Sequence, residues 1–214
     1  MRLALPTLHD PVVTVRPIRV RDARVLEAEL RTGRGWLRRW EATNPGSGPS
    51  YGARAGIRLL RDMAREGVGL PFVMEVGGEF AGQLNVSQIS FGSLSSCAIG
   101  YWVAERFAGR GVTPTAVALV ADHCFTELGL HRVEICIRPE NAASLRVVEK
   151  LGFRYEGIRR RYIHIDGAWR DHFAFALTVE DVPFGVLERW RSDRVDPNWA
   201  RVPAIDRIAA GLAG

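Results

Sequence analysis

The run Arg106-Phe-Ala-Gly109-Arg110-Gly111 lies between a predicted strand and a predicted helix. Glycines in such a loop let successive backbone N–H groups point into one concavity, and the start of the following helix adds partial positive charge. The loop therefore favours binding of a pyrophosphate, with an ordinary strand-to-helix turn as the alternative. The sequence contains neither G-x-x-x-x-G-K-[ST] nor G-x-G-x-x-G, which excludes a P-loop and disfavours a dinucleotide Rossmann fold.

A second segment whose residues could take part in a reaction begins at Arg138 and reads R-P-E-N-A-A-S. Asn141 stands where a helix is predicted to start, and asparagine is favoured as a helix N-cap. The Ser144 hydroxyl, three residues on, could act on a leaving group or bond locally to the helix backbone. Glu134, on the predicted strand before this segment, could serve as a general base. Its alternative role is an ion pair with Arg132 or Arg138.

Hydrophobic periodicity predicts the elements that must position these residues. Apolar residues alternate in the predicted strands, and Gly77-Gly78 suits a two-residue hairpin turn. The order of elements predicts a mixed α/β sheet in one domain, residues 1–192, followed by a tail, 193–214. Strands are expected at 12–18, 70–76, 79–87, 95–103, 132–138, 153–164 and 169–179, and helices at 22–31, 36–41, 53–66, 113–128 (amphipathic), 141–151 and 180–191, with a loop at 44–52.

Composition excludes several classes of protein. The 214 residues are 47% hydrophobic and 25% charged, which is typical of a globular domain. No apolar run is long enough for a transmembrane helix, and the first 13 residues make a poor signal peptide, so we expect a cytoplasmic location. Three cysteines without C-x-x-C spacing, and histidines without H-E-x-x-H spacing, argue against disulfides and against a metal site.

The net charge of +5 comes almost entirely from arginine, because Lys150 is the only lysine. Arginine suits planar, bidentate contacts with phosphates and carboxylates. The surplus fits an anionic ligand or a ribonucleoprotein neighbour, and equally a solvated basic surface.

Taken together, these segments resemble the GNAT superfamily of N-acetyltransferases. The loop Arg106-x-x-Gly109-x-Gly111 resembles its pyrophosphate motif, Ile99-Gly-Tyr-Trp-Val103 its fourth strand, and R-P-E-N-x-x-S…L-G-F its second cofactor segment. Glu156-Gly157 and the W-R-D-H run ending at His172 extend the match to the RimJ/RimL branch, which acetylates ribosomal proteins. The stretch from Pro71-Phe-Val to Gly82-Gln83-Leu84 also resembles RimJ, as in its actinobacterial members. The resemblance covers residues 12–179.

The resemblance implies a fold and a site. The fold is a mixed, mostly antiparallel, V-shaped sheet flanked by helices, with acetyl-CoA between the strands at 95–103 and 132–138. Asn141 would bind the pantetheine through its side chain, and Ser144 would stabilise or protonate the departing thiolate. Glu134 is a candidate base, although it stands about two residues earlier relative to Asn141 than the strand glutamate that does this work in the related RimI enzymes. The residues implied to bind acetyl-CoA are Trp102, Val103, Arg106, Gly109, Arg110, Gly111, Val112, Thr113, Asn141 and Ser144, with no metal.

The leading hypothesis is direct acetyl transfer to the α-amine of a protein N-terminus, for instance that of a ribosomal protein. An α-amine needs little base catalysis, because its pKa of about 7.7–8.0 lies near neutrality. The alternatives are acetylation of a small amine, and a ribosome-associated or acyl-CoA-binding protein without turnover. A monomer or dimer is expected, and direct nucleic-acid binding is not.

The remaining candidates have two interpretations each. Trp36 and Trp40, four residues apart, could share a helix face in the core or line the acceptor cleft. The run at 159–161, three arginines, could meet RNA or the 3′-phosphate of the cofactor, or form a solvated strand edge. The cysteines are not expected to carry an acyl group, and Cys124 and Cys136, which have apolar neighbours, are interpreted as core residues. His123 and His172 are interpreted as structural, and neither Tyr155 nor Tyr162 is preferred as an acid.

Overall fold

The seven predicted strands and one short unpredicted strand, Leu8–His9, form one eight-stranded sheet in the computed structural model, which describes residues 3–46 and 52–212. Their order is β1-β2-β3-β4-β5-β6-β8-β7, and every neighbouring pair is antiparallel except β5 and β6. The mixed, mostly antiparallel sheet is therefore confirmed. The strands are β1 (Leu8–His9), β2 (Thr14–Pro17), β3 (Leu70–Val76), β4 (Glu79–Ser90), β5 (Ser96–Val103), β6 (Arg132–Ile137), β7 (Arg154–Ile165) and β8 (Ala168–Thr178).

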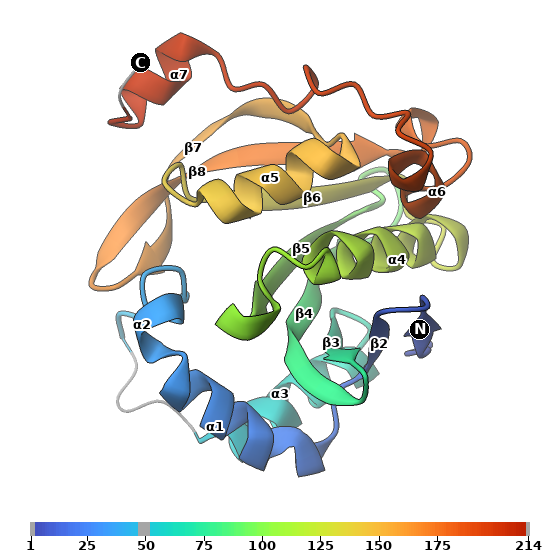
Figure 1. Cartoon of the computed structure of the whole chain (residues 1–214), viewed down its shortest axis with the longest axis vertical. Helices are drawn as coiled ribbons and strands as arrows, with labels where there is room; N and C mark the ends of the chain where they lie inside the picture. Colours follow the sequence, from blue (N-terminus) through green and yellow to red (C-terminus); the bar gives the residue numbers. More distant parts are fainter. Residues whose placement is uncertain (1–2, 47–51, 213–214) are drawn as a thin grey trace.

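Helices cover both faces of this sheet (Figure 1). The predicted loop at 44–52 falls partly outside the described residues, because 47–51 are not among them. Within the described ranges, no helix has the length and apolarity needed to cross a bilayer. The helices are α1 (Ala23–Thr32), α2 (Arg34–Leu37), α3 (Ala53–Arg65), α4 (Val112–Thr126), α5 (Ala142–Leu151), α6 (Val186–Arg191) and α7 (Ala204–Ala209), with short 3₁₀ turns at η1 (Val20–Asp22), η2 (Glu105–Phe107) and η3 (Val179–Asp181).

Two predicted helices differ from the structure at their ends. The piece expected at 36–41 is a single turn that begins earlier, at Arg34, and ends at Leu37. The helix expected from residue 180 begins only at Val186. Its first residues form η3 instead, because the Asp181 carboxylate bonds back to the Thr178 N–H in a capping box.

The sheet opens where its only parallel pair ends. β5 and β6 pair over just three positions, Ser96–Ala98 with Arg132–Glu134, and then separate. In Figure 1, β6, β7 and β8 lie above α4, whereas β3 and β4 lie below it. The predicted V-shaped splay between these two strands is confirmed, and it leaves the facing edges of both strands available to other groups.

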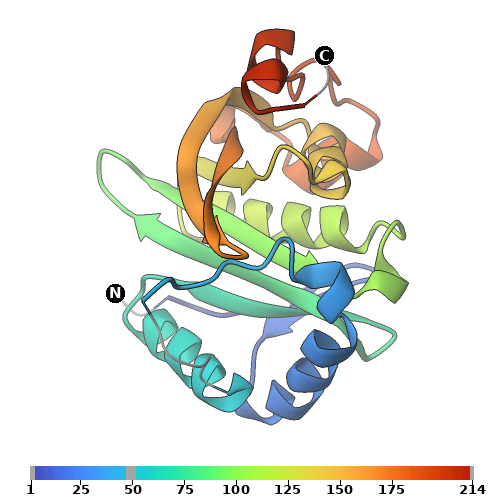
Figure 2. The same ribbon diagram turned by 90° about the vertical axis from the view of Figure 1, so that its left-hand side faces the viewer.

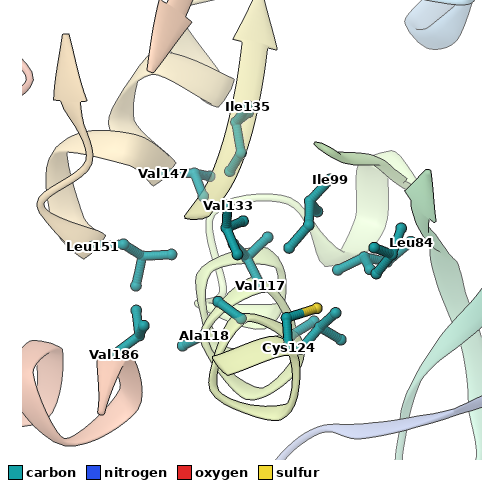
Figure 3. Close-up of a cluster of buried hydrophobic side chains, with 14 of the residues drawn as sticks. Leu84, Ile99, Val117, Ala118, Cys124, Val133, Ile135, Val147, Leu151 and Val186 are labelled. Atoms are coloured by element: carbon teal, nitrogen blue, oxygen red, sulfur yellow. The ribbon is translucent and has the colours of Figure 1, made fainter. Parts of the chain in front are cut away.

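The main core lies around α4, which was expected to be amphipathic and is instead buried on nearly every side. It packs between the sheet and the helices α5 and α6, so it has almost no solvated face; helices of this kind are apolar all round. Figure 3 shows Val117, Ala118 and Cys124 of α4 among side chains from both halves of the sheet. A smaller cluster joins α1 and α3 to the opposite face of β3 and β4. This packing holds the two arms of the V in place.

The chain beyond residue 193 runs back along β7. The backbone N–H of Tyr155 donates to Trp199 O at 2.8 Å, and the Tyr155 hydroxyl donates to Asp206 at 2.9 Å. Burial and the Asp206 carboxylate raise the pKa of Tyr155. This tyrosine is therefore engaged on the outer edge of the sheet, away from the splay.

Candidate functional site

Two cavities meet inside the splay of the sheet. The first has a volume of about 460 Å³ and runs between the end of β5, the start of α4 and the start of α5. The second has a volume of about 390 Å³ and continues between β5, β6 and the β7–β8 hairpin. Both are lined by the same six residues where they join, Leu37, Trp40, Tyr101, Trp102, Asn141 and Ser144.

The glycine loop forms one end of the first cavity. Gly109 and Gly111 have φ of +74° and +77°, a region that glycine enters without strain. The first hydrogen bond of α4 runs from the Thr115 N–H to Gly111 O at 3.1 Å, so the amides of Val112 and Thr113 precede it. These amides and the helix dipole make this end of the cavity suited to an anion.

The two arginines of the loop are turned away from the cavity. Arg106 donates to both carboxylate oxygens of Glu29 on α1, at 2.6 and 2.9 Å, and to Phe80 O. The Arg110 guanidinium lies 5.4 Å from the centre of the Phe107 ring. Neither side chain lines the cavity. Arg106 instead ties the loop to α1, so its predicted contact with the cofactor has no support from the geometry.

Other cations take the place of these arginines at the mouth of the first cavity: Arg39, Arg146 and Lys150 line it. Arg146 and Lys150 stand four residues apart on α5, which brings them to one face of the helix. That spacing was the available sequence signal, and it was missed. The arginines at 159–161 do not line this cavity.

The end of β5 carries Trp102 and Val103. Both residues line the first cavity, as expected for a contact with an extended ligand arm. The Val103 carbonyl already accepts a hydrogen bond from the Trp36 indole at 3.0 Å. This bond holds α2 over the cavity. Trp36 lines the first cavity and Trp40 lines both cavities, so neither packs in the core, and a place in the acceptor cleft stays a prediction.

Asn141 caps α5, and the cap places Ser144. The Asn141 Oδ1 accepts the Ser144 N–H at 3.1 Å, which confirms the predicted N-cap and leaves the Nδ2 group free of that role. Among the described residues, the Ser144 hydroxyl makes no hydrogen bond to the helix backbone. Ser144 lies where the two cavities join. The alternative, a local hydrogen bond from its hydroxyl to the helix backbone, is therefore absent from the described residues.

Tyr101 is the residue at this junction that sequence reasoning missed. Its hydroxyl is buried without an ordinary hydrogen bond to any described residue, although the Ser144 side chain lies close enough to affect it. Burial raises the pKa of the phenol, and the interaction with Ser144 opposes that rise only in part. The hydroxyl groups of Tyr101 and Ser144, both protonated at neutral pH, therefore lie together where the two cavities join.

Glu134 lies outside both cavities. One carboxylate oxygen accepts from Arg132 at 2.8 Å, and the other accepts from Arg159 of β7. The alternative of an ion pair is therefore correct for Arg132, whereas Arg138 binds Arg39 O and Glu140 instead. With both oxygens held by guanidinium groups, the carboxylate is poorly available as a base.

Charged groups are few in the second cavity: Glu41 and Arg138 are the only ones among the described residues that line it. Glu41 is ion-paired with Arg34 at 2.5 Å. The Arg138 side chain is 12% exposed, and its Nε–H is buried without a partner in the described residues. A buried donor of this kind needs an oxygen acceptor.

The segment after α2, residues 38–43, covers one side of the second cavity. Ala42 pairs with Ile165 at the tip of the β7–β8 hairpin, and the Thr43 N–H donates to His164 O at 2.8 Å. Arg38 adds an ion pair with Asp166 at 2.9 Å. Figure 2 shows this segment running beside the hairpin. The second cavity is therefore covered on one side by two segments distant in sequence.

The cysteines are poor nucleophiles. Cys124 is buried in the core, as expected, and so is Cys97. Cys136 was expected in the core and instead lines the second cavity, because β5 and β6 have separated at this point of β6; burial raises the pKa of its thiol to about 11. Since the thiolate is the reactive form, Cys136 stays unreactive at neutral pH.

Comparisons with known proteins agree with this geometry. Residues 13–154 match the family described as Acetyltransferase (GNAT) domain. Among solved structures, the chain is similar to Mycobacterium smegmatis RimJ in complex with CoA-disulfide, with 39% identity and a TM-score of 0.81 over 89% of this chain and 94% of that one.

Two curated proteins extend the comparison. The chain is 30% identical over 173 residues to the [Ribosomal protein uS5]-alanine N-acetyltransferase of Escherichia coli (strain K12), covering 79% of this chain and 89% of that protein. It is 42% identical over 100 residues to "Probable N-acetyltransferase YjcK" of Bacillus subtilis (strain 168). That match spans 47% of this chain and about half of the relative, 55%.

Proposed function

This chain belongs to the GNAT family of acetyltransferases, and we propose that it transfers acetyl from acetyl-CoA directly to the α-amine of a protein N-terminus, with ribosomal proteins as the acceptor class. An acetyl-CoA-dependent N-acetyltransferase is what the family match and the similarity to RimJ support. The observation that carries the proposal is the junction of two cavities at Ser144 and Tyr101.

The first cavity has the groups that acetyl-CoA requires. The amides of Val112 and Thr113 would bind the pyrophosphate, and the cations Arg146 and Lys150 would neutralise phosphate charge. The walls between these groups and the junction are largely apolar, which suits the pantetheine arm. When bound, acetyl-CoA supplies an acetyl group activated as a thioester.

At the junction, the chain contributes proton donors. The Ser144 hydroxyl would hydrogen-bond the departing sulfur, and Tyr101 would hold the Ser144 hydroxyl and resupply its proton. The buried phenol stays protonated at neutral pH, so this donor is ready whenever the site fills. No side chain here is a good acyl carrier, and direct transfer relies on holding the two reactants together.

The second cavity favours a peptide N-terminus over a polycation. A small polyamine or aminoglycoside would need several carboxylates, whereas Glu41, the only acidic residue in the described lining, is already ion-paired. The unpartnered Arg138 Nε–H would instead donate to the carbonyl oxygen of the first acceptor residue. A carbonyl beside the amine is what distinguishes an N-terminal residue from a simple amine.

The test measures thiol release from acetyl-CoA with two sets of acceptors. One set is peptides that begin with Ala, Ser or Met, and the other is small amines, including amines matched to alanine but lacking its carbonyl. Turnover with the peptides, loss of turnover when their N-terminus is blocked, and at least 10-fold lower kcat/KM for the matched amines are expected.

Two other outcomes would assign a different function. Turnover with small amines alone would identify a small-molecule acetyltransferase. Tight acetyl-CoA binding without release on any acceptor, including intact ribosomal proteins, would favour an acyl-CoA-binding protein. The proposal includes a cytoplasmic location, because bacterial ribosomal proteins are synthesised there.

A further inference from the structure

His172 of β8 lies in the wall of the second cavity, although its sequence context was interpreted as structural. The residue is 3% exposed. It precedes Phe173, which forms the last pair of β6 and β8 with Ile137. It is therefore next to the end of β6, from which the chain continues through Arg138 to Asn141.

One ring nitrogen of His172 is committed. Nδ1 lies 3.0 Å from the carbonyl oxygen of Arg170. A carbonyl oxygen only accepts, so Nδ1 carries the proton and donates it to that oxygen. In the neutral ring, Nε2 then holds a lone pair, and it has no hydrogen-bond partner among residues 3–46 and 52–212. The fold thus fixes the tautomer and leaves one basic nitrogen unused.

Burial is the main reason that the ring stays neutral. It lowers the pKa of His172, the hydrogen bond to Arg170 O raises the pKa in part, and the nearby Arg138 guanidinium lowers it again; Glu140 and Asp171 act to raise it, and the net shift is downward. From β7, the Tyr162 ring lies edge-on at 5.9 Å, and Arg159 is the partner of His172 in the strand register. At neutral pH the imidazole is therefore a base, and it does not repel an incoming ammonium.

We propose that Nε2 of His172 is the proton acceptor for the attacking amine, which deepens the proposed acetyl transfer and rests on it. The amine nitrogen forms a bond to the thioester carbonyl carbon and gives up one proton to Nε2. The C–S bond breaks with its electron pair on sulfur, and the sulfur takes a proton from the Ser144 and Tyr101 pair. Imidazolium then loses its proton to solvent, and the hydroxyl pair regains one, so the products are the acetylated amine and the free thiol.

The other ionisable groups lining this cavity do not fit the role. Glu41 is held by Arg34, and Cys136 is a protonated thiol. Glu134, the candidate base from the sequence, lies outside the cavity with both oxygens bound to arginines. Among the described residues that line the second cavity, His172 is the one group that combines a neutral, basic nitrogen with burial in the cavity wall.

The kinetic test uses two variants that divide the functions of the ring. His172→Asn keeps a donor for Arg170 O and removes Nε2, and His172→Gln keeps a polar atom near Nε2 that cannot take a proton. We expect both to lower kcat with the best peptide about 100-fold, within the range typical of a lost general base, with acetyl-CoA affinity unchanged. His131→Asn, at an exposed histidine paired with Glu180, is the matched control and keeps full activity.

Two further readouts exclude a merely structural effect. In the wild type, kcat falls as pH drops through the lowered pKa of His172, and this limb disappears in His172→Asn. Imidazole added to His172→Ala restores at least a tenth of the lost rate. Unchanged kcat in His172→Asn, or a retained acidic limb together with no rescue, would overturn the proposal.

A measurement without any acceptor separates this proposal from the proposed function. Nitrogen-15 NMR of the histidine ring at pH 7 is expected to report Nδ1–H and an unprotonated Nε2 in the wild-type protein. An Nε2–H tautomer or an imidazolium would refute the role of His172 even if acetylation is observed. Failure of every acceptor, with the expected tautomer present, would refute the proposed function instead.

Discussion

Replacing Gly111 with alanine tests whether the loop geometry, rather than its composition, binds the anionic end of acetyl-CoA. A Cβ at this position would meet no atom within 4 Å, so the substitution introduces no clash. The cost comes from φ of +77°, which disfavours alanine by about 1–2 kcal/mol. For a chain of this size, each kcal/mol lowers Tm by about 2–4 °C.

The effect on binding is separate from the effect on folding. Alanine relieves its strain by rotating the backbone, which turns the amides of Val112 and Thr113 away from a common target. Hydrogen bonds to charged groups contribute about 1.5–3 kcal/mol each, so partial loss of these bonds weakens acetyl-CoA binding by about 10-fold. Titration calorimetry with acetyl-CoA and thermal unfolding give the two numbers.

Gly129 provides the matched control. Its φ is +64°, a Cβ there would also meet nothing within 4 Å, and it lies in the turn between α4 and β6 rather than at a cavity. Gly129→Ala is therefore expected to lose similar stability while keeping wild-type acetyl-CoA affinity. Equal affinities in Gly111→Ala and Gly129→Ala would refute the argument that the backbone of this loop binds the cofactor.

Three further predictions concern groups whose roles the structure separates. Tyr101→Phe removes a buried hydroxyl that lacks an ordinary partner, so stability is expected to stay within about 1 kcal/mol of wild type while kcat falls about 10-fold; equal loss of both would point to a packing role. Arg106→Ala breaks a partly exposed ion pair with Glu29 worth about 0–1 kcal/mol and is expected to leave acetyl-CoA affinity unchanged. Lys150→Ala is expected to weaken binding of acetyl-CoA more than binding of its 3′-dephospho form. Calorimetry in which Arg106→Ala lost affinity and Lys150→Ala did not would contradict the cavity assignment. Burial alone would raise the pKa of Asp22, but hydrogen bonds from Arg16 and from the Arg19 N–H lower this pKa overall. The carboxylate therefore stabilises the fold above the unfolded pKa near 3.8, and this stabilisation is lost as pH falls below that value. Tm measured from pH 5 to pH 2 should fall more steeply in the wild type than in Asp22→Asn.

Local signals in the sequence determined the elements that carry the site. Gly109 and Gly111 are read correctly from the chain because a left-handed backbone at a strand-to-helix turn favours glycine. The Asn141 cap is equally local, since its side chain bonds to an amide only three residues away. The hairpins are predicted by Gly77-Gly78 and by Asp166-Gly167, all four with positive φ. Each of these features depends on residues within one turn of each other.

Tertiary structure alone decided which side chains face the cavities. Arg106 is drawn away by Glu29, which is 77 residues earlier, and Glu134 is held by Arg159, which is 25 residues later. Tyr101 and His172 come to the cavity walls because β5 and β6 diverge beyond their third paired position. Alternation indicates that a side chain points to one face or the other, but not what meets it there. The ion-pair partners, the burial of these side chains and the tautomer of His172 depend on packing between segments that are distant in sequence. A local sequence pattern carries no information on the free energies of those contacts.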